Sequence, residues 1–73
     1  MIVCYCDEDG NDIASLENAH CPGVGETVHV KAWDADLRRW FDNEYRVTQL
    51  TYYVTRAPGE ARQRVVVTLE EMA

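Results

Sequence analysis

Hydrophobic and polar residues alternate along most of this 73-residue chain, which is the pattern of β-strands with one buried face. Turn signals separate the alternating stretches, and Asp9-Gly10 is typical of a hairpin turn. Five strands are predicted, at residues 2–6, 11–16, 26–33, 44–56 and 61–70. We therefore expect an all-β protein with a single domain spanning residues 1–73, as the short length also implies.

The longest predicted strand, 44–56, contains a break in its pattern. Its apolar phase slips by one residue between Val47 and Leu50, which predicts a β-bulge or a sharp bend. Five strands, one of them long and bent, are too few for a large sandwich. A small, strongly bent or closed barrel buries the inward faces and removes most open edges, so we expect that architecture.

Residues 34–43 depart from the alternation. Leu37, Trp40 and Phe41 are spaced i, i+3 and i+4, as on one face of a short helix, and Asp34 or Asp36 could cap it. The pattern predicts a short helical insert between the third and fourth strands. The insert would cover one open end of the barrel with Trp40 and Phe41, although the sequence leaves the exposure of Trp33 and Trp40 open.

Three strings carry a resemblance to a known family: P-x-V-G-E-x-V-x-V at 22–30, Y-x-V-x-x-L-x-Y at 45–52 and V-x-V-x-L at 65–69. The first strand followed by D-E-D-G adds to it. Together they resemble small SH3-like β-barrel proteins encoded as short open reading frames in proteobacteria and their phages. The resemblance implies an SH3-like barrel in a phage or prophage setting, where such proteins often bind a host or defence protein. It includes no catalytic motif.

Charge is distributed unevenly. The net charge is −6, and residues 1–30 contain six of the thirteen acids and none of the seven Lys and Arg residues. An acidic chain is repelled by nucleic-acid phosphates and attracts basic partners. The first candidate protein-binding surface is therefore the acidic hairpin, with Asp7, Glu8, Asp9 and Asp12. The simpler interpretation is that these charges only keep a small domain soluble.

A second candidate protein-binding surface is the insert, with Arg38, Arg39, Trp40 and Phe41. Trp and Arg are the residue types enriched at binding hot spots. The leading hypothesis is thus a non-enzymatic module that binds a host or bacterial protein. A structural subunit that self-associates through strand edges, as a homo-oligomer, is a further alternative.

Arginines and tyrosines near the last hairpin suggest another alternative, a nucleotide or nucleic-acid surface that stacks bases. Its residues would be Arg46, Arg56, Arg62, Arg64 and Tyr53. The competing interpretation is that these arginines are solvated and pair with nearby glutamates, each pair contributing about 0.2–1 kcal/mol. The acidic net charge favours the competing interpretation.

Metal ligation has a weak signal. The set Cys4, Cys6, His20 and Cys21 has the composition of a tetrahedral zinc site. Its C-x-C spacing on a strand, and the adjacency of His20 and Cys21, fit separate packing roles better. Either face of the first strand could be buried, and outward thiols at Cys4 and Cys6 would be open to oxidation.

The acids at 7–12 lack calcium-loop spacing, because the glycine comes at Gly10, earlier than an EF-hand requires. Ser15 has no G-x-S-x-G around it, so we expect no enzyme activity and no cofactor. The chain has no apolar run near the roughly 20 residues of a membrane span and no leader pattern. With an odd number of cysteines, a cytoplasmic location is expected.

Overall fold

The computed structural model describes residues 1–17, 20–54 and 63–72, and these form one five-stranded sheet. The strands are β1 (Ile2–Asp7), β2 (Asp12–Glu17), β3 (Thr27–Asp34), β4 (Arg39–Val54) and β5 (Gln63–Glu71). Their order in the sheet is β2-β1-β5-β4-β3. β1 and β5 are parallel, whereas the other neighbours are antiparallel. The predicted all-β class and its five strands are confirmed. The turn expected at 57–60 lies outside the described residues.

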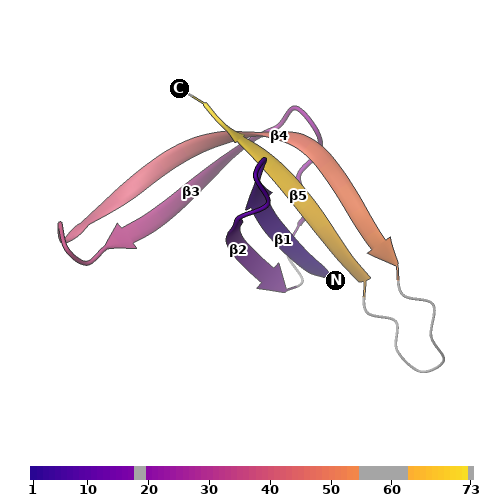
Figure 1. Cartoon of the computed structure of the whole chain (residues 1–73), viewed down its shortest axis with the longest axis horizontal. Helices are drawn as coiled ribbons and strands as arrows, with labels where there is room; N and C mark the ends of the chain where they lie inside the picture. The colour runs from indigo at the N-terminus through magenta and orange to yellow at the C-terminus, as the bar shows by residue number, and fades with distance from the viewer. Residues whose placement is uncertain (18–19, 55–62, 73) are drawn as a thin grey trace.

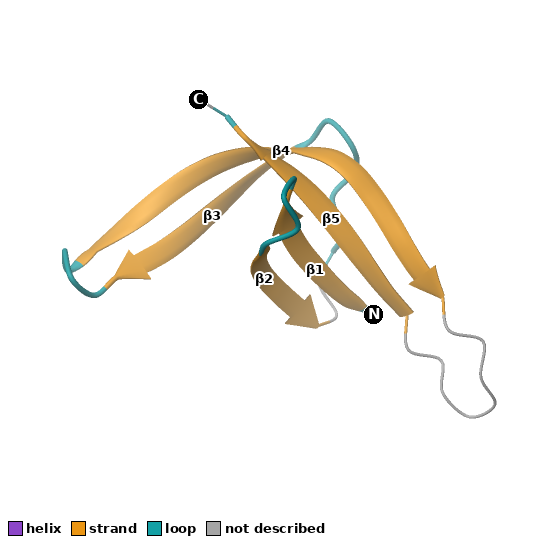
Figure 2. Ribbon diagram, in the orientation of Figure 1, coloured by secondary structure: helices purple, strands orange, loops and turns teal. Residues whose placement is uncertain are grey.

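The sheet is curled but not closed. β4 arches over the molecule, with β3 beneath one half of it and β5 beside the other half, so that the outline is an inverted V (Figures 1 and 2). β2 and β3 are the two edges of the sheet and do not pair with each other. The structure is thus a half-barrel, because the described strands cover only part of the circumference that a closed barrel needs. Its Cα radius of gyration is 14.0 Å, compared with about 11 Å for a compact chain of this length.

The predicted irregularity in the fourth strand is confirmed. The register between β4 and β5 shifts between Val47 and Gln49. Val47 is paired with Leu69 before the shift, and Leu50 with Val67 after it. The extra residue therefore keeps apolar side chains of β4 on the same, concave face of the sheet on both sides of the bend.

The core lies on this concave face and is small. Its buried side chains are Val3, Tyr5, Val47, Val65, Val67 and Leu69. Parallel pairing places Val3 beside Val65 and Tyr5 beside Val67. This settles which face of the first strand is buried, because Cys4 and Cys6 must then point to the convex face.

The first hairpin follows its turn signal. Gly10 donates its backbone N–H to the carbonyl of Asp7 over 3.1 Å, and its φ of 86° is in the left-handed region that glycine adopts without strain. Gly25, with a φ of 90°, leads into β3 and donates its N–H to the carbonyl of Val47 over 2.9 Å. A glycine thus occupies a turn position at both places.

The predicted helical insert is wrong. Residues 35–38 form a turn that joins β3 directly to β4, with Asp34 paired opposite Arg39 and Trp33 opposite Trp40. A ten-residue helix with three apolar side chains is marginal in water, whereas aromatic residues stabilise each other across strands. Neither does Trp40 cover the core, since it is 65% exposed. The described residues contain no helix, and hence none that could span a membrane.

Candidate protein-binding surfaces

The hairpin of residues 27–46, called the arm below, packs against the core at its base, through Val28, Val30 and Tyr45, and its outer end extends away from the rest of the molecule (Figure 1). β4 pairs with β5 only from Tyr45 onward, so the outer part of the arm is a two-stranded ribbon. A two-stranded hairpin on its own is marginally stable in water. Contacts between its own side chains must therefore hold the arm.

A pair of tryptophans provides one such contact. Trp33 and Trp40 lie opposite each other, with ring centroids 5.5 Å apart and planes inclined by 62°. This edge-to-face geometry is favourable by about 0.5–1.5 kcal/mol beyond the area that it buries. Nevertheless the rings are 52% and 65% exposed, which answers the question that the sequence left open.

The other side of the arm has a cation–π contact. The Arg39 guanidinium lies 4.4 Å from the centroid of the Phe41 ring, a contact of about 0.5–1 kcal/mol at an exposed site. Phe41 is half-buried and pairs opposite Ala32, on the face of the arm opposite to Trp40. The predicted group Arg38-Arg39-Trp40-Phe41 therefore divides between the turn and the two faces of a ribbon.

The turn at the end of the arm is fixed by Asp34. One of its carboxylate oxygens accepts backbone N–H groups from Asp36 over 2.9 Å and Leu37 over 3.1 Å. Arg38 completes the turn with a φ of 51°, the left-handed region. The helix cap expected at Asp34 or Asp36 is therefore absent, and Asp34 stabilises a hairpin turn instead. Leu37 beside it is 61% exposed.

The arm carries charges of both signs. Its four bases are interspersed with four acids: Lys31, Arg38, Arg39 and Arg46 against Asp34, Asp36, Asp42 and Glu44. His29 Nδ1 lies 3.1 Å from a carboxylate oxygen of Asp42, and both side chains are about half exposed, so this pair contributes little to stability. Mixed charges around exposed aromatic rings are typical of a protein-binding surface rather than a phosphate-binding one.

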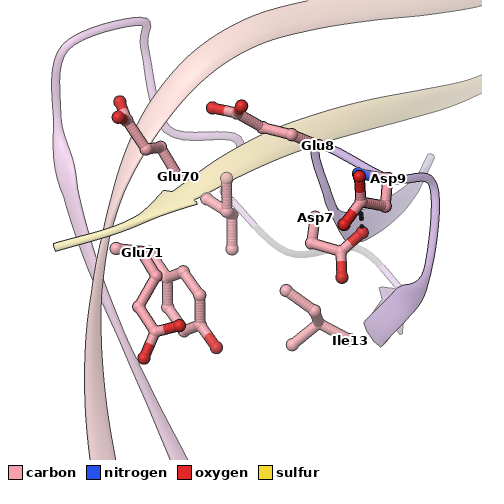
Figure 3. Close-up of a pocket in the computed structure, with 8 residues that line it drawn as sticks. Asp7, Glu8, Asp9, Ile13, Glu70 and Glu71 are labelled. Carbon is pink, nitrogen blue, oxygen red and sulfur yellow. Dashed lines mark hydrogen bonds between the residues drawn. The ribbon is translucent and has the colours of Figure 1, made fainter. Parts of the chain in front are cut away.

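The acidic residues of the first hairpin line a pocket on another part of the molecule (Figure 3). Asp7, Glu8 and Asp9 form one side, and Glu70 and Glu71 of β5 form the other. Apolar side chains complete it: Ile13, Tyr45 and Leu69. Sequence reasoning missed Glu70 and Glu71, because only the parallel pairing of β1 with β5 brings the end of the chain to the first turn. Asp12, in contrast, pairs opposite Cys6 and is not among the lining residues.

Asp7 has a structural role in this turn. One of its oxygens accepts the backbone N–H groups of Asp9 and Asn11, and the other accepts the side-chain amide of Asn11. These hydrogen bonds, those from Asn11 first, lower the pKa of the Asp7 carboxyl below its usual value. A carboxylate already engaged in this way is poorly placed to serve as a calcium ligand.

The arginines proposed for nucleotide binding are not gathered at one place. Arg46 pairs opposite Glu70 near one end of the β4–β5 ladder, and Arg64 pairs opposite Tyr53 near the other. The Arg64 guanidinium lies 4.6 Å from the centroid of the Tyr53 ring, so stacking within the protein already occupies one face of that ring. The remaining two, Arg56 and Arg62, lie outside the described residues.

The cysteines lie on different faces of the sheet. Cys4 and Cys6 are half-buried on the convex face, where Ser15 Oγ donates to the Cys4 sulfur over 3.6 Å. Cys21 packs against the core. There, burial first and the Cys21 thiol second raise the pKa of Tyr5. His20 is exposed, and the described part of the chain contains no group of three side chains arranged to hold a metal.

Comparisons of the chain with protein-family models, with curated proteins and with solved structures gave no match. A functional proposal must therefore be argued from these surfaces. Among them, the end of the arm combines exposed aromatic area, a fixed backbone and arginine side chains.

Proposed function

We propose that this protein is a non-enzymatic protein-binding module whose contact surface is the end of the arm. Its residues are the predicted Arg38, Arg39, Trp40 and Phe41, joined by Trp33 and Leu37. The observation that carries the proposal is the Trp33–Trp40 pair, which is more than half exposed on a projecting ribbon. The SH3-like classification and the host or defence partner come from the resemblance in sequence and remain part of this proposal.

The energetics favour a contact at this place. A Trp side chain that is about half exposed still has on the order of 100 Å² to bury, which corresponds to roughly 2–3 kcal/mol per ring. Leu37 adds a third exposed apolar side chain beside the turn. Few contacts are needed for a specific complex when large aromatic anchors occupy its centre.

Preorganisation lowers the cost of binding. The Asp34 hydrogen bonds fix the turn, and the Trp–Trp and Arg39–Phe41 contacts hold the large side chains in place before a partner arrives. Less conformational entropy is then lost on association than for a flexible loop. A rigid, exposed aromatic pair therefore suits recognition of an apolar groove on a folded partner.

The acidic pocket provides a secondary contact within this proposal. Its five carboxylates would attract basic residues of the partner and accelerate association. A partner whose basic groove normally binds phosphates is the kind that both surfaces together would suit, with the pocket acting as a decoy. Association by way of the pocket should weaken steeply with salt.

The test is affinity capture from a bacterial lysate, with quantitative mass spectrometry of the captured proteins. We expect Trp33→Ala, Trp40→Ala and Leu37→Ser each to reduce one captured protein at least about tenfold, the factor for a loss of ~1.4 kcal/mol. Tyr53→Ala is the matched control, because Tyr53 is a half-exposed aromatic residue away from the arm. Capture that is equal for the wild type and the arm variants would refute the proposal.

The secondary contact is tested separately with Glu8→Gln and Glu71→Gln, which remove charge from the pocket. Asp7 is unsuitable for this purpose, because its carboxylate holds the turn. We expect slower association with the same captured protein and a smaller dependence on salt. An association rate that both variants leave unchanged would remove the acidic pocket from the proposal but leave the arm in it.

A further inference from the structure

The two free edges of the sheet face each other across a groove. β2 and β3, together with Tyr5 of β1, line it with apolar side chains, and its volume is about 280 Å³. The residues are Tyr5, Ala14, Leu16, Val28, His29, Val30 and Lys31. Open edges with apolar side chains invite pairing with another strand, and soluble proteins usually protect them. Neither β2 nor β3 contains a proline, and Leu16 is 50% exposed.

We propose that two copies of the chain join at these edges, so that β2 of each copy pairs with β3 of the other. The two half-barrels then form one closed sheet of ten strands around a shared apolar interior. This inference is independent of the proposed function, because residues 33–39 at the end of the arm extend beyond the part of β3 that β2 can cover.

Strand direction permits this arrangement. β1 and β5 are parallel, and each is antiparallel to its other neighbour. β2 therefore runs opposite to β1, while β3, which is antiparallel to β4, runs with β1. A two-fold axis along the barrel keeps these directions, so β2 meets β3 of the second copy in antiparallel orientation at both junctions.

Side chains match in one register. With Leu16 opposite Val28 of the second copy, Ala14 lies opposite Val30, and all four face the concave side that holds the core. On the convex side, Ser15 lies opposite His29. Apolar residues thus meet inside and polar residues outside, which is the condition that fixes a strand register.

Charge complementarity supports the same register. Asp12 is on the convex face of β2 and, past the irregularity at Ile13, comes next to Lys31 of the second copy. β2 ends in acids, Asp12 and Glu17, and has no base, whereas β3 has the lysine and a histidine in its exposed row. Pairing of β3 with β3 would bring lysine toward lysine, and pairing of β2 with β2 would bring acid toward acid. Pairing of β2 with β3 is therefore favoured over both.

Closure would also account for the small core. Among the residues that the structure describes, the core has only six buried hydrophobic side chains, while Val28, Val30, Tyr45 and Leu50 are partly buried against it. A second half-barrel covers these side chains from the open side. It also removes the four open edges of the two separate copies, which is the stabilising feature of a closed barrel.

The test is sedimentation equilibrium of the full chain together with a charge swap. We expect a species of twice the 8.4 kDa chain mass. Lys31→Glu and Asp12→Lys should each weaken the dimer by roughly tenfold, and the double variant should restore its affinity through the reversed pair. Arg38→Glu, which makes the same charge change in the turn, should leave the dimer unchanged. Circular dichroism of each variant verifies that the fold is retained.

Two results would overturn the inference: a monomer at every concentration, or a double variant that stays as weak as the single ones. Open-ended oligomers would also overturn it, because a closed ring of two copies leaves no free edge. Trp40→Ala separates this inference from the proposed function, since it should lose the captured partner and keep the dimer. Hydrogen exchange supplies a second readout, as the backbone amides of β2 and β3 should become more protected when the protein concentration rises.

Discussion

Trp33 and Trp40 face each other across the β3–β4 ladder with their ring centroids 5.5 Å apart, and solvent still reaches more than half of each ring. Because of this cross-strand contact, the segment forms the two-stranded arm and not the helix that the spacing of Leu37, Trp40 and Phe41 predicts. The contact stabilises a ribbon that has little support from the core. It also leaves the largest apolar side chains of the chain available for a partner.

The tryptophan pair should contribute measurably to the arm. We expect Trp33→Ala and Trp40→Ala each to lower the free energy of unfolding by about 0.5–1.5 kcal/mol, and the double variant to lose less than the sum of the two. A coupling energy near zero in urea denaturation would show that the rings do not stabilise each other. Far-ultraviolet circular dichroism should lose the same exciton signal in either single variant.

Arg38 holds a backbone conformation that suits glycine, with a φ of 51°. Arg38→Gly removes the steric cost of a side chain in that region, so we expect the free energy of unfolding to rise by about 0.5–1 kcal/mol. Arg39→Gly is the control: Arg39 is in a strand and contacts Phe41, so its replacement should destabilise the protein. Equal effects of the two changes in thermal denaturation would contradict this explanation.

Asp7 should make the stability of the first hairpin depend on pH. Its hydrogen bonds to Asn11 and Asp9 lower its pKa in the folded state below the unfolded value near 3.8. The contribution is therefore fully present above that value and is lost as the pH falls through the lower, folded pKa. Carbon-detected NMR titration of the Asp7 carboxyl should show the depressed midpoint. In Asp7→Asn, the loss of stability as the pH falls below the unfolded pKa should be smaller, because this group no longer titrates.

The sequence predicted the features that depend on neighbouring residues. Alternation located all five strands, the Asp9-Gly10 signal located the first turn, and the phase slip located the bulge after Val47. The helix prediction is wrong because the same i, i+3, i+4 spacing over ten residues also occurs in a hairpin whose turn lies between two aromatic residues, here Trp33 and Trp40. In that case a contact between distant positions, Trp33 and Trp40, decides the structure.

The candidate surfaces were predictable only in part, for the same reason. Composition alone points to Arg38, Arg39, Trp40 and Phe41, whereas the exposure of Trp33 depends on the partner strand. Charge alone points to Asp7, Glu8 and Asp9. Glu70 and Glu71 join them through a parallel pairing over more than sixty residues of chain, and no local pattern encodes such a contact.

Two leucines separate folding from binding. Leu69 is 1% exposed in the core, whereas Leu37 is 61% exposed beside the turn of the arm. Leu69→Ala leaves a cavity and should cost about 2–5 kcal/mol, which is comparable to the whole stability expected of a domain this small. Leu37→Ala, the same chemical change, should cost less than about 0.5 kcal/mol.

The two variants should therefore have opposite effects in two assays. Urea denaturation should detect the Leu69 change and hardly register the Leu37 change. At a temperature where both variants remain folded, the amount of captured partner should fall for Leu37→Ala and stay unchanged for Leu69→Ala. If Leu37→Ala also retained full capture, the apolar end of the arm would not be the contact surface. The acidic pocket would then be the remaining candidate surface, and the salt dependence of partner binding would test it.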